Sequence, residues 1–462
     1  MYQDYEDLGH FMLSATPPAA RRCLPVEDIN DDKAATDAVS LPFCVRLLQV
    51  TDLHCFPKDC QEFQGVPLLD AHERCLRLVD QLVRDVRPDV ILLTGDIIDG
   101  RGPWAPDDVT QAVRDLIPHF HQTPWCFVPG NHDDDHSPWK RHDLQQIFQL
   151  DGCLQKGARR GFHHTILLSK STFINHETVT IQVRLHLFDS GGNHPNPRIM
   201  YCCTPPEAVR GFVEFHKQQH QKQQYQQQQQ QQRQQKFKET TISAASTTVR
   251  PTELVYFHIP LPEYQFIDPV IGHNNLFEAA LEGGKIPKPL HRWLWLVRLF
   301  KLHRIAGCSR GPDSGLFHAM LQAKRSYGAN IVAAFCGHDH HSDAVFHRQG
   351  IFLGYGRSGA MTPPFDWEGK APNDLAPGAR VVQVDSAGRT QTWIQNHDSA
   401  ESDSFLDMVR TKKESDGASK QNICIWPDLT ICYILYTRVV WVCLATLQTA
   451  YDKSSHSNGC WN

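Results

Sequence analysis

Residues 45–54 read VRLLQVTDLH, and this stretch decides the fold class. The apolar run at 45–50 predicts a short buried strand, and Asp52 and His54 follow it at once. Polar side chains directly after a buried strand are typical of α/β proteins, which place active sites at the carboxyl ends of strands. The same arrangement recurs further along the chain.

Helices and strands alternate after this first strand. Residues 70–86 carry apolar side chains at the spacing of an amphipathic helix, and residues 90–94 and 125–128 predict buried strands. A helix is expected over 108–120, and Ser137-Pro138 predicts the start of another that runs to about 150. Further strands are expected at 180–188, 254–257, 331–335, 344–347, 351–353, 380–384 and 391–393, and a further helix at 315–327. This order predicts an α/β fold with more β-structure toward the C-terminus.

Composition separates a central domain from less regular segments. Residues 216–236 are almost all Gln and cannot bury enough apolar surface to offset their ordering entropy, which predicts a disordered surface insertion. Residues 396–423 are rich in Ser, Asp and Lys and indicate a linker. The predicted organisation is a flexible leader at 1–40, a domain at 41–395 with the Gln-rich insertion at about 216–250, a linker at 396–423 and an apolar tail at 424–462.

The apolar tail allows three interpretations. Residues 430–450 are long enough to cross a membrane, but Arg438 near their centre costs about 2.5–3.5 kcal/mol on insertion scales. A buried, strand-rich extension and a tail from a shifted reading frame are the other two. A membrane partner is therefore predicted only through this tail. The first residues contain no apolar run of signal-peptide length, so a cytoplasmic location is the default expectation.

The overall composition is that of an ordinary globular protein. The 462 residues carry a formal net charge of -5, and no basic field of the kind that gathers nucleic acid is visible, so no nucleic-acid partner is predicted. The 15 Cys are scattered without a CxxC pair, which excludes a zinc ribbon and a small disulfide scaffold. The 26 His are more informative, because several stand beside Asp, Asn and Gly in short motifs.

Five polar motifs follow predicted strands. They are Asp52-Leu53-His54, Gly95-Asp96-Ile97-Ile98-Asp99, Gly130-Asn131-His132-Asp133, the single His258, and Gly337-His338-Asp339-His340. Carboxylate and imidazole ligands suit Zn, Fe or Mn, and a shared carboxylate can hold two such ions roughly 3.5–4 Å apart. Each motif alone is weak, but the ordered set predicts a two-metal site.

The ordered set DLH, GDIID, GNHD, a lone His and GHDH resembles the calcineurin-like metallophosphoesterases over roughly residues 43–395. Within that superfamily the chain is most similar to the small, divergent purple acid phosphatase-like proteins of plants and fungi. The stretches that carry this likeness are YFHIPLPEY around His258, LFDSGGN at 187–193, GCSRGPDSGLF at 307–317 and FCGHDHHSDAVF at 335–346. The resemblance implies a four-layer α/β fold in which two mixed β-sheets are flanked by helices.

The resemblance also implies a role for each motif residue. One metal would be held by Asp52, His54, Asp96 and His340, and the other by Asp96, Asn131, His258 and His338, with Asp96 as the bridge. His132 would bind no metal and would donate a proton to the leaving oxygen, while Asp99 orients its ring. Because Asp99 stands where the purple enzymes carry a metal-binding Tyr, the metal pair stays open among Fe, Zn and Mn.

The expected reaction is hydrolysis of a phosphomonoester by in-line attack of a metal-bound hydroxide. The expected substrate is a small phosphate ester or a phosphorylated molecule. Two alternatives stay open: a phosphodiesterase on the same scaffold, and a metal-binding adaptor that does not turn over. The complete ligand set argues against the adaptor, because a copy that had lost activity would usually have lost a ligand.

Overall fold

The computed structural model describes residues 5–14, 43–56, 58, 60, 62–63, 66–67, 70–100, 106–135, 140–159, 161–174, 177–196, 199–236, 250–264, 269–272, 312–361, 375–397 and 406–408. The chain divides into two units, Met1–Val409 and Arg410–Asn462. All of the described residues belong to the first unit, and the predicted apolar tail lies outside them.

One sheet is built around the strand that the opening stretch predicts. The parallel strands β2 (Cys44–Val50), β5 (Val90–Thr94) and β6 (Trp125–Val128) lie side by side. On its other edge β2 pairs antiparallel with β13 (Gly378–Asp385), and the sheet continues through β14 (Thr390–Asn396) to β15 (Leu406–Asp407). Each residue of β5 is buried, because this central strand has both of its faces covered.

The other sheet has the order β1-β7-β8-β9-β10-β12-β11 over the described residues. Its strands are β1 (Glu6–Met12), β7 (His164–Ile174), β8 (Glu177–Leu187), β9 (Thr252–Tyr256), β10 (Ile331–Cys336), β11 (Val345–Arg348) and β12 (Ile351–Tyr355). The neighbours β8, β9, β10 and β12 run parallel, whereas β7 and β11 pair antiparallel with β8 and β12. A separate short hairpin is formed by β3 (Glu62–Phe63) and β4 (Val66–Pro67).

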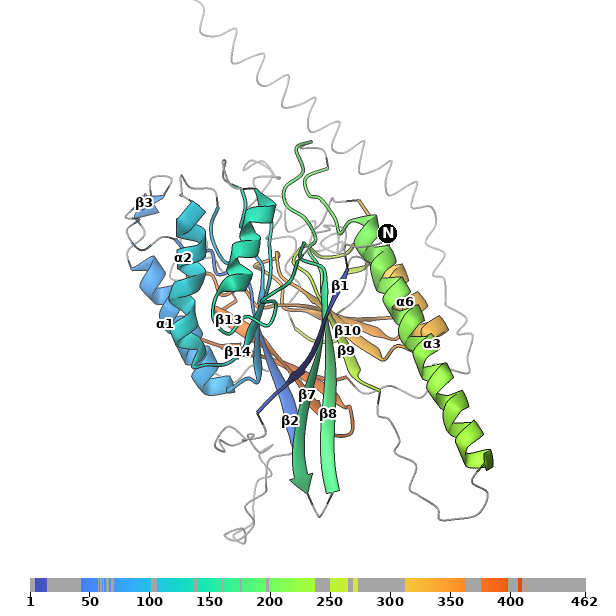
Figure 1. Cartoon of the computed structure of the whole chain (residues 1–462). Coiled ribbons are helices and arrows are strands. Elements are labelled where there is room, and N and C mark those ends of the chain that lie inside the picture. The colour runs from blue at the N-terminus through green and yellow to red at the C-terminus, as the bar shows by residue number, and fades with distance from the viewer. Residues whose placement is uncertain are drawn as a thin grey trace, which may run out of the picture. The chain divides into compact units, whose positions relative to one another are not determined.

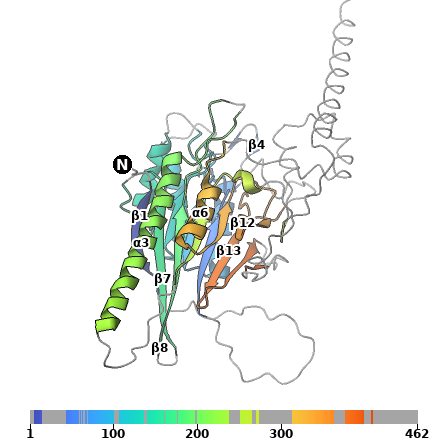
Figure 2. The same ribbon diagram turned by 90° about the vertical axis from the view of Figure 1, so that its right-hand side faces the viewer.

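Helices cover the outer faces of the two sheets (Figure 1). The six-stranded sheet carries α1 (Ala71–Val86), α2 (Pro106–Leu116) and the 3-10 helices η1 (Ile117–Phe120) and η2 (Arg141–Gln149). The seven-stranded sheet carries α3 (Pro206–Lys236) and α6 (Leu316–Tyr327), which lie in front of its strands in the turned view of Figure 2, and the 3-10 turn η3 (Pro262–Tyr264).

The apolar side chains form three buried layers, as four stacked layers of elements require. The first joins the helices α1 and α2 to the six-stranded sheet, and the second joins α3 and α6 to the seven-stranded sheet. The third lies between the two sheets, where Leu47 and Val382 of one sheet and Leu254 and Phe335 of the other are fully buried. The structure therefore confirms the expected sandwich of two mixed sheets flanked by helices.

The expectation of disorder in the Gln-rich segment is wrong for residues 216–236. They continue α3, whose first turns bury Ala208 and Phe212 against the sheet. Gln is a good helix former, and a helix already nucleated by packing extends at little cost. The tract therefore needs no apolar surface of its own to stay helical. Residues 237–249 of the predicted insertion lie outside the described residues.

Two segments predicted to be irregular contribute strands. Within the supposed leader, β1 pairs in parallel with the edge strand β7, although its side chains show no clean alternation of burial. Within the supposed linker, Leu406 and Asp407 pair with β14. Both are edge strands held by backbone hydrogen bonds, which composition does not reveal. The helix expected from Ser137 begins, in the described part, as a 3-10 helix at Arg141, and Ser137 itself lies outside it.

None of the helices among the described residues is both long enough and apolar enough to cross a membrane. Residues 430–450, the stretch that sequence analysis considers for this role, are outside the described part of the chain.

Candidate metal centre

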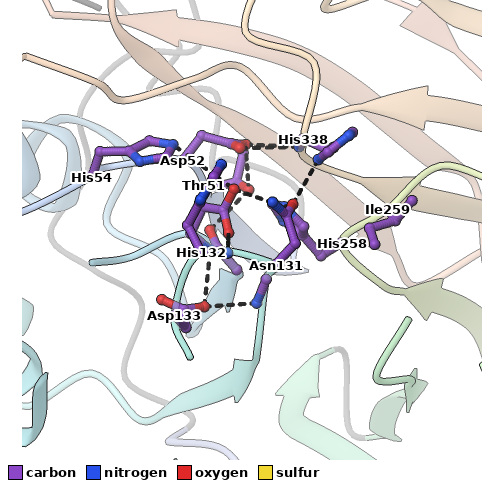
Figure 3. A network of polar contacts seen from close by, with 12 residues as sticks. Thr51, Asp52, His54, Asn131, His132, Asp133, His258, Ile259 and His338 are labelled. Carbon is purple, nitrogen blue, oxygen red and sulfur yellow. Dashed lines mark hydrogen bonds and ion pairs between the residues drawn. The ribbon is translucent and has the colours of Figure 1, made fainter. Parts of the chain in front are cut away.

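The polar motifs converge because they follow parallel strands whose carboxyl ends meet. Asp52 and His54 come after β2, Asp96 after β5, and Asn131 after β6, all from the six-stranded sheet. His258 follows β9 and the pair His338 and His340 follows β10, both from the seven-stranded sheet. Figure 3 shows Asp52, Asn131, His258 and His338 gathered at this place. The site thus lies where the two sheets face each other.

The ligand-type atoms form two sets on either side of Asp96. Asp52, His54 and His340 form one set, and Asp96, His258 and His338 form the other, with the ligand atoms of each set within 4.8 Å of one another. Asp96 Oδ2 lies 3.1 Å from His258 Nε2 and 3.8 Å from His54 Nε2, so it faces both sets. This is the arrangement that a bridging carboxylate requires.

The first set places two imidazole nitrogens and a carboxylate oxygen around one point. His54 Nε2 lies 3.1 Å from His340 Nε2, and His340 Nε2 lies 3.5 Å from Asp52 Oδ1. On its other edge, His54 presents Nδ1 to Asp99 Oδ2 at 3.6 Å. A carboxylate behind the ring holds the other nitrogen toward the metal position, as is usual for histidine ligands.

The second set includes the amide of Asn131. Asn131 Oδ1 lies 2.8 Å from His338 Nδ1 and 3.2 Å from His258 Nε2 (Figure 3). His258 donates from Nδ1 to the carbonyl oxygen of Thr94 at 2.9 Å, which directs Nε2 to Asp96 and Asn131. Oxygen and imidazole donors of this kind suit Zn, Fe or Mn, so the residues fit the metals that the sequence predicts.

The electrostatics of the buried centre favour positive charge. Burial alone lowers the pKa of His258, but the adjacent Asp96 carboxylate overrides it and raises the pKa to about 9. Burial and the neighbouring His258 together lower the pKa of His338 to about 3. The Asp96 carboxylate therefore favours positive charge in its immediate surroundings.

Backbone strain at the ligands shows how tightly their positions are set. Asp52, His54, Asp96 and His338 have positive φ values of 53°, 46°, 50° and 76°. Such conformations are costly for residues other than Gly, and they concentrate at functional sites where the surrounding structure enforces them. Here the positive φ values turn the chain sharply after each strand, where the ligand side chains are positioned.

Glycines next to the ligands make room for this packing. A Cβ atom at Gly95 would lie 2.4 Å from His258 Nδ1, and one at Gly337 would lie 2.1 Å from Thr51 Oγ1. Both separations are far below a van der Waals contact, so any other residue would displace a ligand or its support. The motif glycines therefore permit close approach of the ligand loops.

Asp133 is a structural residue to which the sequence motif assigns no role. Its buried carboxylate accepts backbone N–H groups from Asp96, Ile97, Ile98 and Gly130 at 2.6–3.1 Å. Burial and the nearby Asp96 charge raise the pKa of Asp133 to about 6. These bonds join the loop after β5 to the loop after β6 and so hold Asp96 beside Asn131.

A second support was also missed by sequence analysis. The guanidinium of Arg141 binds both carboxylate oxygens of Asp189, at 2.8 and 2.6 Å, and Asp134 at 2.7 Å. Asn193, four residues after Asp189, accepts a bond from Asn131 Nδ2 at 3.3 Å. That contact turns Asn131 Oδ1 toward the metal position. The signal available in the sequence was the LFDSGGN stretch, which contains Asp189 and ends at Asn193.

The structure changes the predicted partner of His132. His132 Nδ1 lies 2.5 Å from Asp135 Oδ2, whereas the Asp99 carboxylate faces His54. The carboxylate beside His132 Nδ1 is therefore that of Asp135 and not that of Asp99, the residue that the sequence predicts. A spacing of three residues within one loop allows that contact, while Asp99 is fully buried behind the ligand ring. His132 remains at the rim of the centre, with its side chain 24% exposed.

The four-layer sandwich and the two donor sets define the class of protein as a metallophosphoesterase. The chain belongs to the calcineurin-like phosphoesterase family, which it matches over residues 45–342. It is similar to a protein of Arabidopsis thaliana named "Probable inactive purple acid phosphatase 29", with 22% identity over 356 residues that cover 74% of this chain and 76% of that protein.

Two solved structures are also similar to this chain at low identity. A dimetal phosphatase from Danio rerio has 12% identity, with coverage of 79% of this chain and 98% of that one and a TM-score of 0.43. The purple acid phosphatase PPD1 from yellow lupin (Lupinus luteus) seeds also has 12% identity, with coverage of 79% and 53% and a TM-score of 0.37.

Proposed function

We propose that this protein hydrolyses phosphomonoesters with two transition-metal ions bound at the centre. The observation that supports the proposal is the position of Asp96 Oδ2 between His54 and His258, with a full donor set on each side. Bound there, two ions of Fe, Zn or Mn would supply positive charge for the phosphoryl oxygens and a nucleophilic water at neutral pH.

The chain's own groups would position the substrate and move the proton. The ring of His132 lies next to that of the ligand His54, with 5.4 Å between their centroids, and its side chain is partly open to solvent. In this position it would reach the leaving oxygen of a phosphate ester. Asp135 binds Nδ1 and so directs Nε2, on the opposite edge of the ring, to donate the proton.

The substrate class we propose is a small phosphate monoester or a phosphorylated molecule, and the rival on this scaffold is a phosphodiesterase. A second rival is a metal-binding protein without turnover, since the name of the Arabidopsis relative describes an inactive protein. Against this rival, all seven predicted ligands in this chain are present and face the centre. No nucleic-acid partner is proposed.

The decisive experiment combines metal analysis of purified full-length protein with two assays. We expect turnover of p-nitrophenyl phosphate well above that of bis(p-nitrophenyl) phosphate. Asp96→Asn should lose metal from both positions and abolish turnover, while the same change at the exposed Asp85 should alter neither. A preference for the diester would support the phosphodiesterase, and bound metal without any turnover would support the adaptor.

A further inference from the structure

A third group of metal-ligand side chains lies away from the dimetal centre, beneath α3. His186 of β8, Glu253 of β9 and His216 of α3 are all buried, with exposed fractions of 0%, 4% and 3%. The two strands are parallel neighbours, and α3 lies in front of them in Figure 2. The side chains of His186 and Glu253 both approach His216 of α3, so they lie on the sheet face that this helix covers. Neither the family's motifs nor the five motifs of the active centre include these residues.

The ligand atoms of the three residues surround one point. Glu253 Oε2 lies 2.9 Å from His186 Nε2 and 3.5 Å from His216 Nε2, and all three atoms lie within 4.8 Å of one another. In a tetrahedral zinc site with bonds of about 2.0–2.1 Å, neighbouring ligand atoms stand about 3.3 Å apart. The cluster therefore already has nearly the spacing that a divalent ion needs.

The other ring nitrogen of His186, Nδ1, also has a polar partner. It lies 2.5 Å from the hydroxyl of Tyr5, which precedes β1. A polar group on the far nitrogen sets the ring orientation and leaves Nε2 for the metal position, as is usual for histidine ligands. Tyr5 also stacks on Phe188, which secures its own position.

Hydrogen bonding among the described residues does not account for His216. Hydrogen bonds among Tyr5, His186 and Glu253 would satisfy the imidazole of His186 and the carboxylate of Glu253. His216 Nε2, however, is buried and has no hydrogen-bond partner in the described part of the chain, although it points at Glu253. Buried polar atoms of native proteins are normally satisfied, and a metal ion beside Glu253 would supply the missing partner.

Both histidines are in the form that binds metal. Burial lowers the pKa of His216 to about 3 and holds the pKa of His186 well below its usual range. Neutral imidazoles offer a lone pair, whereas an ion pair with Glu253 would require a proton on the ring. One neighbouring charge opposes a cation: Arg184, whose guanidinium lies over the Phe215 ring at 5.0 Å, also acts on both histidines.

We propose that His186, His216 and Glu253 form a structural site for one divalent transition-metal ion, with Zn²⁺ as the best fit, that fastens α3 to the seven-stranded sheet. Two imidazoles and one carboxylate are a donor set that zinc accepts, and a water molecule would complete the tetrahedron. Because the site is buried under a helix, it has no access for a substrate. Arg184 weakens the site, so its ion should leave before those of the dimetal centre during chelation.

The test counts metal in full-length protein. Chains loaded with Zn²⁺ and desalted should hold three ions by elemental analysis. His216→Gln should hold two and keep its phosphatase activity, since Gln removes the ligand on a helix that already accepts Gln at many positions. His220→Gln is the matched control: it makes the same change one turn later on α3, outside the cluster, and should still hold three ions.

Each outcome decides the matter. An unchanged metal count in His216→Gln, whether the wild-type chain holds two ions or three, overturns the proposal. If circular dichroism shows that His216→Gln is unfolded, Glu253→Gln is used in its place. A third ion whose X-ray absorption spectrum shows no imidazole ligands would also overturn the proposal. One ion in the wild-type chain that His216→Gln removes would support the buried site and contradict the dimetal centre instead.

Discussion

At the scale of single residues, neighbours in the GNHDDD segment have quite different surroundings. Asn131 faces the metal position, His132 turns to the rim, and Asp133 is buried beneath the loop. Asp135 then reaches back to His132. A sequence pattern predicts which residue types belong together in such a loop, but the direction of each side chain depends on backbone angles that the pattern does not contain.

The role of His132 can be measured through its dependence on the leaving group. General acid catalysis contributes about 10²–10⁴-fold, so His132→Ala should lower the turnover of an alkyl phosphate by that order. Metal content should stay unchanged, because His132 belongs to neither donor set. The defect should shrink for p-nitrophenyl phosphate, whose leaving group scarcely needs a proton. Steady-state assays on both substrates, with metal analysis, would check this.

The same substitution at Asp135 and at Asp99 distinguishes the residue that orients His132 from the residue that contacts the ligand His54. Asp135→Asn should give a smaller loss of the same kind as His132→Ala, because it disturbs only the tautomer and charge of His132. Asp99→Asn should instead weaken metal binding through His54. Equal slowing of both substrates by His132→Ala, or loss of a metal from it, would show that His132 is a binding residue or a ligand.

At the scale of elements, amphipathic helices and apolar strands could be predicted, including the edge strands β6 and β11, whereas the edge strands β1 and β15 could not. Residues 90–94 and 125–128 are recognisable because a strand covered on both faces must be apolar throughout. The edge strand β1 is mostly exposed on one side and owes its place to pairing with β7. The long strand β7 was missed as well, since its polar residues at 169–172 interrupt the apolar run.

Among the described side chains of the helix α3, only those of its N-terminal part pack against the hydrophobic core. Phe212 is fully buried under the helix, whereas Tyr225 is 63% exposed in the Gln-rich half. Deletion of residues 223–235 should therefore leave turnover and melting temperature nearly unchanged, because the deleted turns have little packing to lose and a changed loop length costs little. The helical signal in circular dichroism should fall. Calorimetry and the phosphatase assay provide the measurement.

Phe212→Ala is the contrasting change on the same helix. Truncation of a buried Phe typically costs about 3–5 kcal/mol, so this variant should unfold at clearly lower urea concentration than the wild type. A large loss of stability in the deletion variant would mean that the Gln-rich turns have a structural role after all.

At the scale of the whole domain, the candidate centre connects the two sheets. The six-stranded sheet provides Asp52, His54, Asp96 and Asn131, and the seven-stranded sheet provides His258, His338 and His340. That the ligands follow buried strands was predictable from the sequence, because each motif comes directly after an apolar run. The supports behind the ligands were not, because the contact of Arg141 with Asp189 depends on how the sheets pack rather than on any local pattern.

Because the centre joins the sheets, removing its metals should loosen the whole domain. An ion at about 1,000-fold excess over its Kd stabilises the folded state by about 4 kcal/mol, so loss of two ions should lower Tm by on the order of 10 °C. Calorimetry with and without a chelator measures the shift, and the His216→Gln chain removes any contribution from the cluster under α3. Asp96→Asn should start at the lower Tm and respond little to the chelator. An equal Tm for wild-type protein in both conditions would mean that the seven residues do not hold metal across the two sheets.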